Sequence, residues 1–395
     1  MAYDVYFDEI RERVDGEPSA RAFADVMAFI KRAYMDAAHR PKVVEELLPY
    51  VLEALEDWPP EHRACTPQSW VFKLAASIED TRLLGSLFRR LLVRGHSSQH
   101  TIDTNGRVPR SYRIRHREPG AQEEALAAII TGPVFEHIEH LVFEECAVQS
   151  DLFEGLRGSD HPLKLRTVSF QHCDVAPEVL RLLGSLGTLS RLESFACDMY
   201  TPSLFSTLAG ARAFASLRAL TLRKLDIDAH TLGEIQALPC FEHLEHLSLP
   251  HGEARLEPGA AVPLLYLPRL VTLDMSHRSW ELEQLELFFG ALEAPGLTRL
   301  DLRYCTLEPQ TLWGLRSLIA HSDISELDLT GACIEESTQS PPPHKLQRYF
   351  LESLPEDIVV EGWALPTHSV KVDSARFIGL DLDQATLDVL EAMYF

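Results

Sequence analysis

The sequence predicts an α/β repeat solenoid preceded by an all-α N-terminal domain. Two observations predict it. A short apolar pattern recurs eight times between residues 138 and 332, and apolar residues at helical spacing fill much of the first 100 residues. The chain has 395 residues, beyond the roughly 250–300 at which one compact core stops growing, whereas a repeat array lengthens without thickening.

The first 100 residues predict a bundle of about four or five helices. Residues 20–40, 42–58 and 70–95 each carry apolar side chains three or four positions apart. The helix breakers that separate them are Pro41, Pro59, Pro60 and Pro67. Because the end of a repeat array exposes apolar surface, we expect this domain, residues 1–100, to cover it.

Residues 101–120 form a connector in which arginine is concentrated, although the chain is otherwise acidic. Its arginines are Arg107, Arg110, Arg113, Arg115 and Arg117. Guanidinium groups pair well with phosphates and carboxylates, so the connector is a candidate contact for an anion. The alternative is a solvated linker that pairs with the acidic surface of the same protein.

Residues 121–340 hold the repeats, and each repeat predicts a strand followed by a helix. The pattern apolar-x-x-apolar-x-apolar begins at Ile138, Leu165, Leu192, Leu217, Leu244, Leu270, Leu297 and Ile324. The intervals are 27, 27, 25, 27, 26, 27 and 27 residues. Apolar residues at helical spacing follow the strand segment, as at Leu307, Leu312 and Leu315.

The unit LTRLDLRYCTLEPQTLWGLRSL, residues 297–318, resembles the leucine-rich-repeat family and its ribonuclease-inhibitor-like, cysteine-containing subclass. The resemblance implies a horseshoe with a parallel sheet on the concave side and helices on the convex side. It places Cys146, Cys173 and Cys305 at the ninth position, near turn backbone, and Cys197 in a core position. Residues 341–395 are expected to form an irregular or degenerate repeat and a C-terminal cap, with Phe377, Leu380 and Leu382 in apolar positions.

Alternation along each strand turns the third and fifth residues of a repeat, with the seventh and eighth, toward the concave surface. Three consecutive fifth positions are Asp274, Asp301 and Asp328, which predicts a row of carboxylates whose repulsion must be offset. The row is a candidate binding site for a partner's Lys or Arg side chains. The alternative is a common strand sequence whose charge is relieved by solvent and nearby arginines. The other candidate binding residues are Arg299, Arg303, Tyr304, His246, His251 and His277.

Composition narrows the classes of partner and compartment. A net charge of −22 favours basic partners and opposes nucleic acid and anionic membranes. No apolar run reaches the ~18–20 residues that cross a bilayer, and no signal peptide precedes the first helix, so a cytoplasmic location is expected. Seven cysteines without a CxxC pair indicate reduced thiols. Only seven of the 37 basic residues are lysine, a bias typical of a GC-rich bacterial genome.

The sequence predicts no catalytic residues, cofactor or metal. It contains no Gly-rich phosphate loop, GxSxG elbow or HExxH helix. His137 and His140 lie three residues apart in a strand and therefore on opposite faces, as do His243 and His246. The better metal candidate would be His251 with His277 and the nearby Asp274.

The sequence therefore favours a non-catalytic protein that binds another protein, with an inhibitor or immunity-type protein as a narrower version. The alternative is an enzyme or ligand-binding site in the N-terminal domain, among Trp58, Trp70, His96 and the arginine connector. A third hypothesis is nucleic-acid binding through residues 107–117, which the acidic charge disfavours. The oligomeric state stays open.

Overall fold

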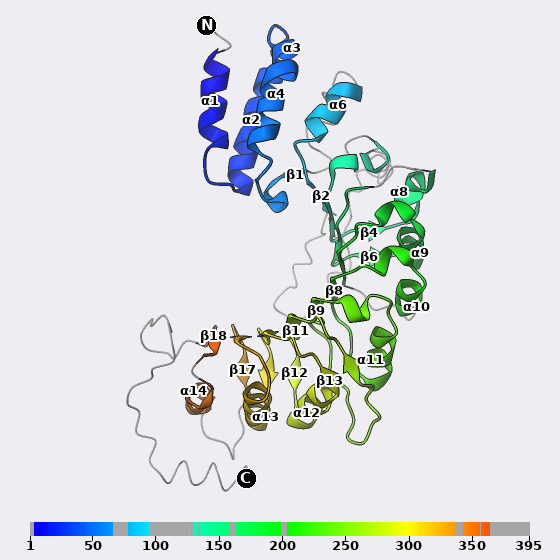
Figure 1. Cartoon of the computed structure of the whole chain (residues 1–395), viewed down its shortest axis with the longest axis vertical. Helices are drawn as coiled ribbons and strands as arrows, with labels where there is room; N and C mark the ends of the chain where they lie inside the picture. Colours follow the sequence, from blue (N-terminus) through cyan, green and yellow to red (C-terminus); the bar gives the residue numbers. More distant parts are fainter. Residues whose placement is uncertain are drawn as a thin grey trace, which may run out of the picture. The chain divides into compact units, whose positions relative to one another are not determined.

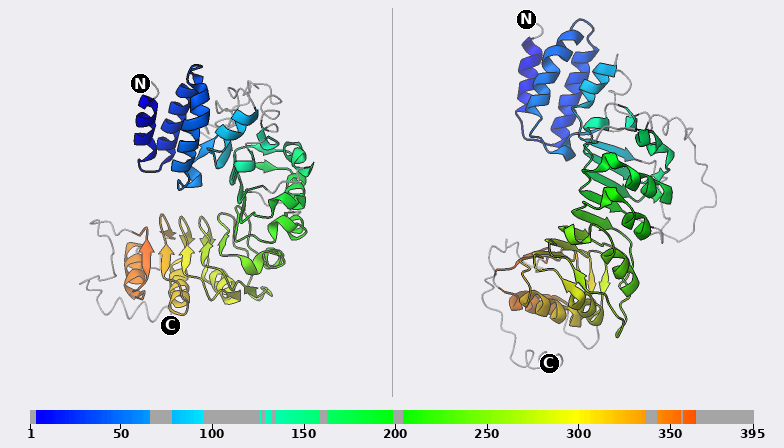
Figure 2. Two further views of the ribbon diagram at one scale, coloured as in Figure 1. Left: turned by 45° about the horizontal axis from the view of Figure 1, so that its top comes forward. Right: turned by 45° about the vertical axis from the view of Figure 1, so that its right-hand side comes forward.

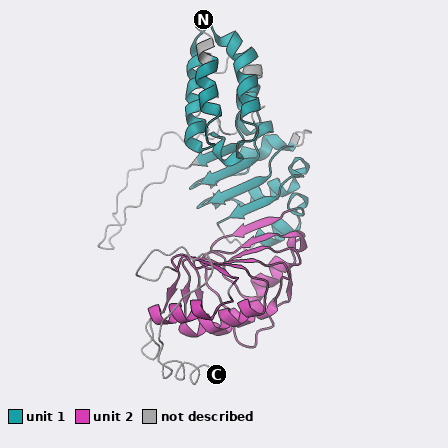
Figure 3. Ribbon diagram, turned by 60° about the vertical axis from the view of Figure 1, so that its left-hand side comes forward, with its two compact units in different colours: residues 1–216 teal, residues 217–395 magenta. Residues whose placement is uncertain are grey.

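The computed structural model describes residues 4–65, 78–94, 126, 129–132, 135–158, 163–198, 204–335, 343–355 and 357–363. The chain divides into two compact units, residues 1–216 and 217–395 (Figure 3). Within the described residues, no helix is both long and apolar enough to cross a membrane. The arginine connector and the positions Trp70, His96, Phe377, Leu380 and Leu382 lie outside the described residues.

The first unit begins with helices: each of the three segments with predicted helical spacing contains one, and a further helix precedes them. Its helices in this part are α1 (Asp4–Val14), α2 (Ala20–Met35), α3 (Arg40–Lys42) with a π-helical turn η1 (Val43–Leu47) and α4 (Leu48–Ala54), and α6 (Ile78–Gly85) (Figure 1). Ser19 caps α2 by accepting the backbone N–H of Ala22 at 3.1 Å. One face of α2 is buried, including Phe23, Val26 and Ile30.

The prediction of an all-helical domain over residues 1–100 is not confirmed, because strands β1 (Ala64–Cys65) and β2 (Arg90–Arg94) lie within it. β2 pairs in parallel with β1 and with the first predicted repeat strand. Phe88, Leu91 and Val93 are buried at the first, fourth and sixth positions of the repeat pattern. An additional repeat therefore precedes the eight that the sequence analysis found.

The repeat strands of the first unit continue this parallel order. They are β3 (His140–Glu144), β5 (Thr167–Gln171) and β7 (Ser194–Cys197), with the short bridge of β4 (Ala147–Val148) and β6 (Asp174–Val175). α8 (Asp151–Glu154), α9 (Pro177–Ser185) and α10 (Leu204–Ala209) follow these strands. In the core, Phe143 stacks on Phe170 with ring centroids 5.4 Å apart, and Phe170 meets Phe195 edge to face at 6.2 Å.

The second unit contains one parallel strand for each repeat. These strands are β8 (Ala219–Leu222), β9 (His246–Ser248), β11 (Thr272–Asp274), β14 (Arg299–Asp301), β16 (Glu326–Asp328) and β18 (Val359–Glu361). Two smaller parallel sheets are built from short strands of the same repeats. One pairs β10 (Leu265–Tyr266) with β13 (Leu292–Glu293), and the other has the order β12 (Ser279–Trp280), β15 (Thr306–Leu307) and β17 (Cys333–Ile334).

Helices lie on one side of these strands, as Figure 2 shows for the second unit. They are α11 (Ala229–Gln236), α12 (Leu282–Ala291), α13 (Pro309–Ala320) and α14 (Pro343–Ser353). The expectation of a helix in every repeat is wrong for the one that begins at Leu244. Its connection, residues 250–267, contains Pro258, Gly259 and Pro263 and forms β10 instead of a helix.

The turn after seven of the described repeat strands has the same backbone conformation. The eighth residue of the repeat has a positive φ at Glu145, His172, Lys224, His251, His277, Tyr304 and Gly331. The ninth residue is then turned inward. The Cys305 thiol donates to the carbonyl of Met275 at 3.2 Å, and burial raises its pKa to about 12. Cys173 and Cys197 are also buried, as the resemblance implied, whereas Cys146 is half-buried.

One ninth position holds a buried arginine rather than a cysteine. Arg278 is 2% exposed. Its guanidinium donates to the carbonyls of Leu249 and Leu225, both at 2.6 Å, and of Glu253 at 3.2 Å. Burial lowers the pKa of Arg278 to about 10, so the side chain is still a cation at neutral pH. It therefore bridges turns of three consecutive repeats.

Candidate functional site

The strand face is our name for the side of the second unit's sheet that lies opposite α12, α13 and α14. Asp274, Asp301 and Asp328 end three neighbouring strands on it and lie directly side by side in register. The structure thus brings together the carboxylate row that the sequence predicted. Asp301 and Asp328 are only 5% and 6% exposed, whereas Asp274 is half-buried.

Each aspartate of the row has the same local hydrogen bond. One carboxylate oxygen accepts the backbone N–H two residues later, from Ser276 at 2.9 Å, Arg303 at 3.0 Å and Thr330 at 3.0 Å. Such a bond is a typical aspartate turn, and it holds the chain as it leaves the strand. Aspartate at the fifth position therefore has a structural role in all three repeats.

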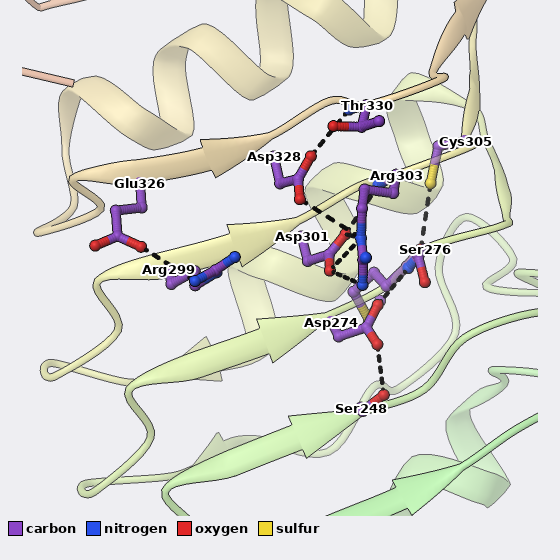
Figure 4. Close-up of polar contacts among 11 residues, drawn as sticks. Ser248, Asp274, Ser276, Arg299, Asp301, Arg303, Cys305, Glu326, Asp328 and Thr330 are labelled. Carbon is purple, nitrogen blue, oxygen red and sulfur yellow. Dashed lines mark hydrogen bonds and ion pairs between the residues drawn. The ribbon is translucent and has the colours of Figure 1, made fainter. Parts of the chain in front are cut away.

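A single guanidinium offsets much of the repulsion within the row. Arg303 donates from Nε to Asp301 Oδ1 and Oδ2, at 2.9 and 2.8 Å, and its Nε lies 3.5 Å from Asp328 Oδ2 (Figure 4). The hydrogen bond to Asp301, with the charges of Asp328 and Asp274, raises the pKa of Arg303 above its ordinary value. Asp274 instead accepts the hydroxyl of Ser248 at 2.6 Å.

The carboxylate row and Arg303 together carry a net negative charge. Three carboxylates and one guanidinium sum to −2, and the nearby pair of Arg299 and Glu326, 3.5 Å apart, adds none. Because the carboxylates are partly desolvated, their field is screened less than that of a solvated surface charge. A cation approaching the strand face is therefore favoured.

A column of stacked rings runs beside the row, at the eighth positions of three repeats. We call His251, His277 and Tyr304 the ring column. The centroids of His251 and His277 are 4.3 Å apart, and those of His277 and Tyr304 are 4.7 Å apart, with planes inclined by 23° and 19°. Tyr304 is 55% exposed, so the column reaches the surface.

The column ends at Gly331, the eighth residue of the next repeat. Gly331 has φ +69°, and a Cβ on it would lie 2.4 Å from Cδ1 of Tyr304. The tyrosine ring therefore leans over a residue that has no side chain. The sequence analysis missed Gly331, although its shared repeat position with Tyr304 was a usable signal.

Two further predicted site residues belong to neither the carboxylate row nor the ring column. Arg299 begins β14, and its side chain is 44% exposed and paired with Glu326. His246 begins β9, is exposed, and pairs in register with Thr272. Both are on the strand face at the third position, where they flank the carboxylate row.

The metal site considered for His251, His277 and Asp274 does not fit the geometry. Ring nitrogens bind a metal in the plane of the ring, and planes only 23° apart in a stacked pair do not converge nearby. Both oxygens of Asp274 already accept hydrogen bonds. Among the described residues, no group of three or more His, Cys, Asp or Glu side chains is placed to hold a metal ion.

The alternative sites have less support in the described part of the chain. Trp58 is 5% exposed and belongs to the core of the first unit. A groove of about 380 Å³ lies between α12 and α13, lined in part by Leu282, Trp313 and His321. The lining is mostly helix surface, and it brings together none of the residues that the sequence analysis selected.

The repeats themselves decide the fold. In all eight, the first, fourth and sixth residues of the pattern are buried, and each contributes one strand to a parallel register. The fold is a leucine-rich-repeat solenoid. No family model matches the sequence, and no curated protein matches it.

Solved structures with leucine-rich repeats align with this solenoid at low identity. The TLR13–ssRNA13 complex is 17% identical over 80% of this chain, with a TM-score of 0.33, and this chain covers 42% of that one, less than half its length. An internalin, InlF, of Listeria monocytogenes is 12% identical over 85% of this chain and 97% of its own, with a TM-score of 0.29. A leucine-rich-repeat protein of Leptospira interrogans is 11% identical over 73% of this chain and 93% of its own, with a TM-score of 0.21.

Arg303 and Arg299 should differ in their effect on stability. Replacing Arg303 by methionine leaves the nearly buried Asp301 without its cation, and we expect the free energy of unfolding to fall by about 1–2 kcal/mol. The same change at Arg299 breaks an exposed pair and should cost less than about 0.5 kcal/mol. Urea unfolding followed by circular dichroism measures both. Equal losses would show that Arg303 does not stabilise the carboxylate row.

Proposed function

We propose that this protein is a non-catalytic binding protein that holds a basic protein partner against the strand face of its second unit. The observation that supports this most strongly is the carboxylate row, which carries a net charge of −2 together with Arg303. An exposed tyrosine and two arginines lie beside it, and these residue types are enriched at the energetic centres of protein interfaces.

The charge of the whole chain supports the same proposal. A net charge of −22 attracts a basic protein from beyond contact distance and raises the rate of encounter. An inhibitor or immunity-type protein that covers a basic toxin or nuclease is a narrower version of the proposal. The ribonuclease-inhibitor-like subclass and a bacterial source belong to the proposal too, on the ninth-position cysteines and the lysine-poor composition.

Affinity capture from the cells that make the protein tests this proposal with two baits of equal charge. Asp274→Asn removes a carboxylate from the strand face, while an asparagine can keep the hydrogen bonds to Ser276 and Ser248. Asp323→Asn, at an exposed turn ahead of β16, removes the same charge elsewhere in the unit. We expect recovery of a basic protein to fall by about five-fold or more with Asp274→Asn only, since a charge-assisted bond is worth about 1.5–3 kcal/mol. Equal recovery with both baits would contradict the proposal.

A further inference from the structure

We infer that the basic partner contributes an arginine side chain whose guanidinium stacks on the exposed part of the Tyr304 ring, at the end of the ring column. This inference rests on the proposed function, because it specifies which cation the strand face receives. Three observations support it: the stacking of the ring column, the glycine that ends the column, and the negative charge of the carboxylate row.

The column has a direction and a regular step. Its rings follow one another at 4.3 and 4.7 Å, close to the ~4.8 Å between neighbouring strands. The next eighth position along the sheet is Gly331, which supplies no ring. One face of Tyr304 therefore meets His277, while the other meets a residue without a side chain.

This chain cannot easily extend the column from its own sequence. Gly331 has φ +69°, close to the +58° and +55° of His277 and Tyr304 at the same repeat position, so the backbone does not exclude a side chain there. The tyrosine ring excludes one, because a Cβ on Gly331 would lie 2.4 and 2.5 Å from Cδ1 and Cε1 of Tyr304. The tyrosine thus keeps 55% of its surface exposed at the end of a rigid stack, which is a preorganised platform for a planar group.

The surrounding charge selects a cation as that planar group. Asp328 accepts the backbone N–H of Thr330, the residue before Gly331, so its carboxylate is fixed close to the end of the column. A guanidinium is planar, remains charged, stacks on aromatic faces and pairs with carboxylates. A lysine ammonium carries the charge but is not a planar group. A nucleic-acid base is planar, but the phosphates of its strand would be repelled by the negative strand face.

Two pentapeptides of equal charge test the inference. One consists of five lysines, and in the other the central lysine is replaced by arginine. Isothermal titration calorimetry at physiological ionic strength measures both on the wild type, Tyr304→Leu and Tyr266→Leu. Tyr266 is the matched control, since it is 49% exposed but lies on β10, outside the main sheet. We expect the arginine peptide to bind the wild type and Tyr266→Leu about three-fold more tightly than the lysine peptide. We expect Tyr304→Leu to bind the two equally.

The outcomes separate this inference from the proposed function. Equal affinity of both peptides for the wild type, or an arginine preference that survives in Tyr304→Leu, would overturn the stacked arginine. Loss of affinity for both peptides in Asp274→Asn would still support a cation-binding strand face. Unchanged affinity of both peptides in Asp274→Asn would overturn the proposed function itself. If a single-stranded oligonucleotide displaces the arginine peptide and depends on Tyr304, the column binds bases and the inference is wrong.

Discussion

Replacing Arg278 by alanine is expected to lower the free energy of unfolding by about 3–5 kcal/mol. The side chain is 2% exposed, and its guanidinium donates to the carbonyls of Leu225, Leu249 and Glu253. Alanine would remove this donor from the carbonyls of Leu225 and Leu249 and open a cavity where the guanidinium lies, whereas the carbonyl of Glu253 would still accept the backbone N–H of Ile227. Since these carbonyls belong to two earlier repeats, the loss should extend beyond the repeat that carries Arg278.

Urea denaturation of Arg278→Ala, followed by circular dichroism, measures this effect. Arg269→Ala is the control, because Arg269 is exposed one residue ahead of the repeat that carries Arg278 and its loss should change stability by less than about 0.5 kcal/mol. Arg278→Lys should recover only part of the difference, since an ammonium cannot reproduce the planar arrangement of donors. Equal midpoints for the two alanine variants would show that the buried guanidinium does not stabilise the turns.

Replacing Gly252 by alanine should also be strongly destabilising, by about 3 kcal/mol or more. Gly252 has φ +88°, and a Cβ there would lie 2.5 Å from the carbonyl oxygen of Leu225. That oxygen also accepts from Arg278, so a shift of the backbone would disturb the arginine. The clash is with backbone, which cannot rotate away as a side-chain end can.

Gly259 separates the two causes of this effect. It has φ +83°, but a Cβ on it would meet nothing within 4 Å. Gly259→Ala should therefore lose only the conformational contribution, about 1 kcal/mol. Thermal unfolding of both variants compares them directly. If Gly259→Ala is as destabilised as Gly252→Ala, contact with the Leu225 carbonyl is not what requires glycine.

The repeat period made the main strand of each of the eight repeats predictable. Intervals of 25–27 residues placed β3, β5, β7, β8, β9, β11, β14 and β16, because the apolar positions of a repeat must all face one core. The same method missed β2, since Phe88 and Ile138 are 50 residues apart and the longer interval hides the shared pattern. Leu91 and Val93 then resembled the end of a helix, although in the structure they alternate along a strand.

The candidate site was predictable in its positions but not in its contacts. Register alone placed Asp274, Asp301 and Asp328 side by side. That Asp301 and Asp328 would be nearly buried, and would bind turn backbone and Arg303, depends on the depth of the turn, which the pattern does not encode. The stacking of His251, His277 and Tyr304 depends on a positive φ at the eighth position, a conformation that histidine and tyrosine do not signal.

Photocrosslinking from position 304 tests the central claim most directly. A photoreactive phenylalanine analogue replaces Tyr304 in one version of the full chain and Tyr266 in another, and the crosslinked products are identified by mass spectrometry. The account predicts a basic protein joined through position 304, at an arginine-containing segment, and not through position 266. The same products from both positions, or a partner joined only through position 266, would contradict binding on the strand face.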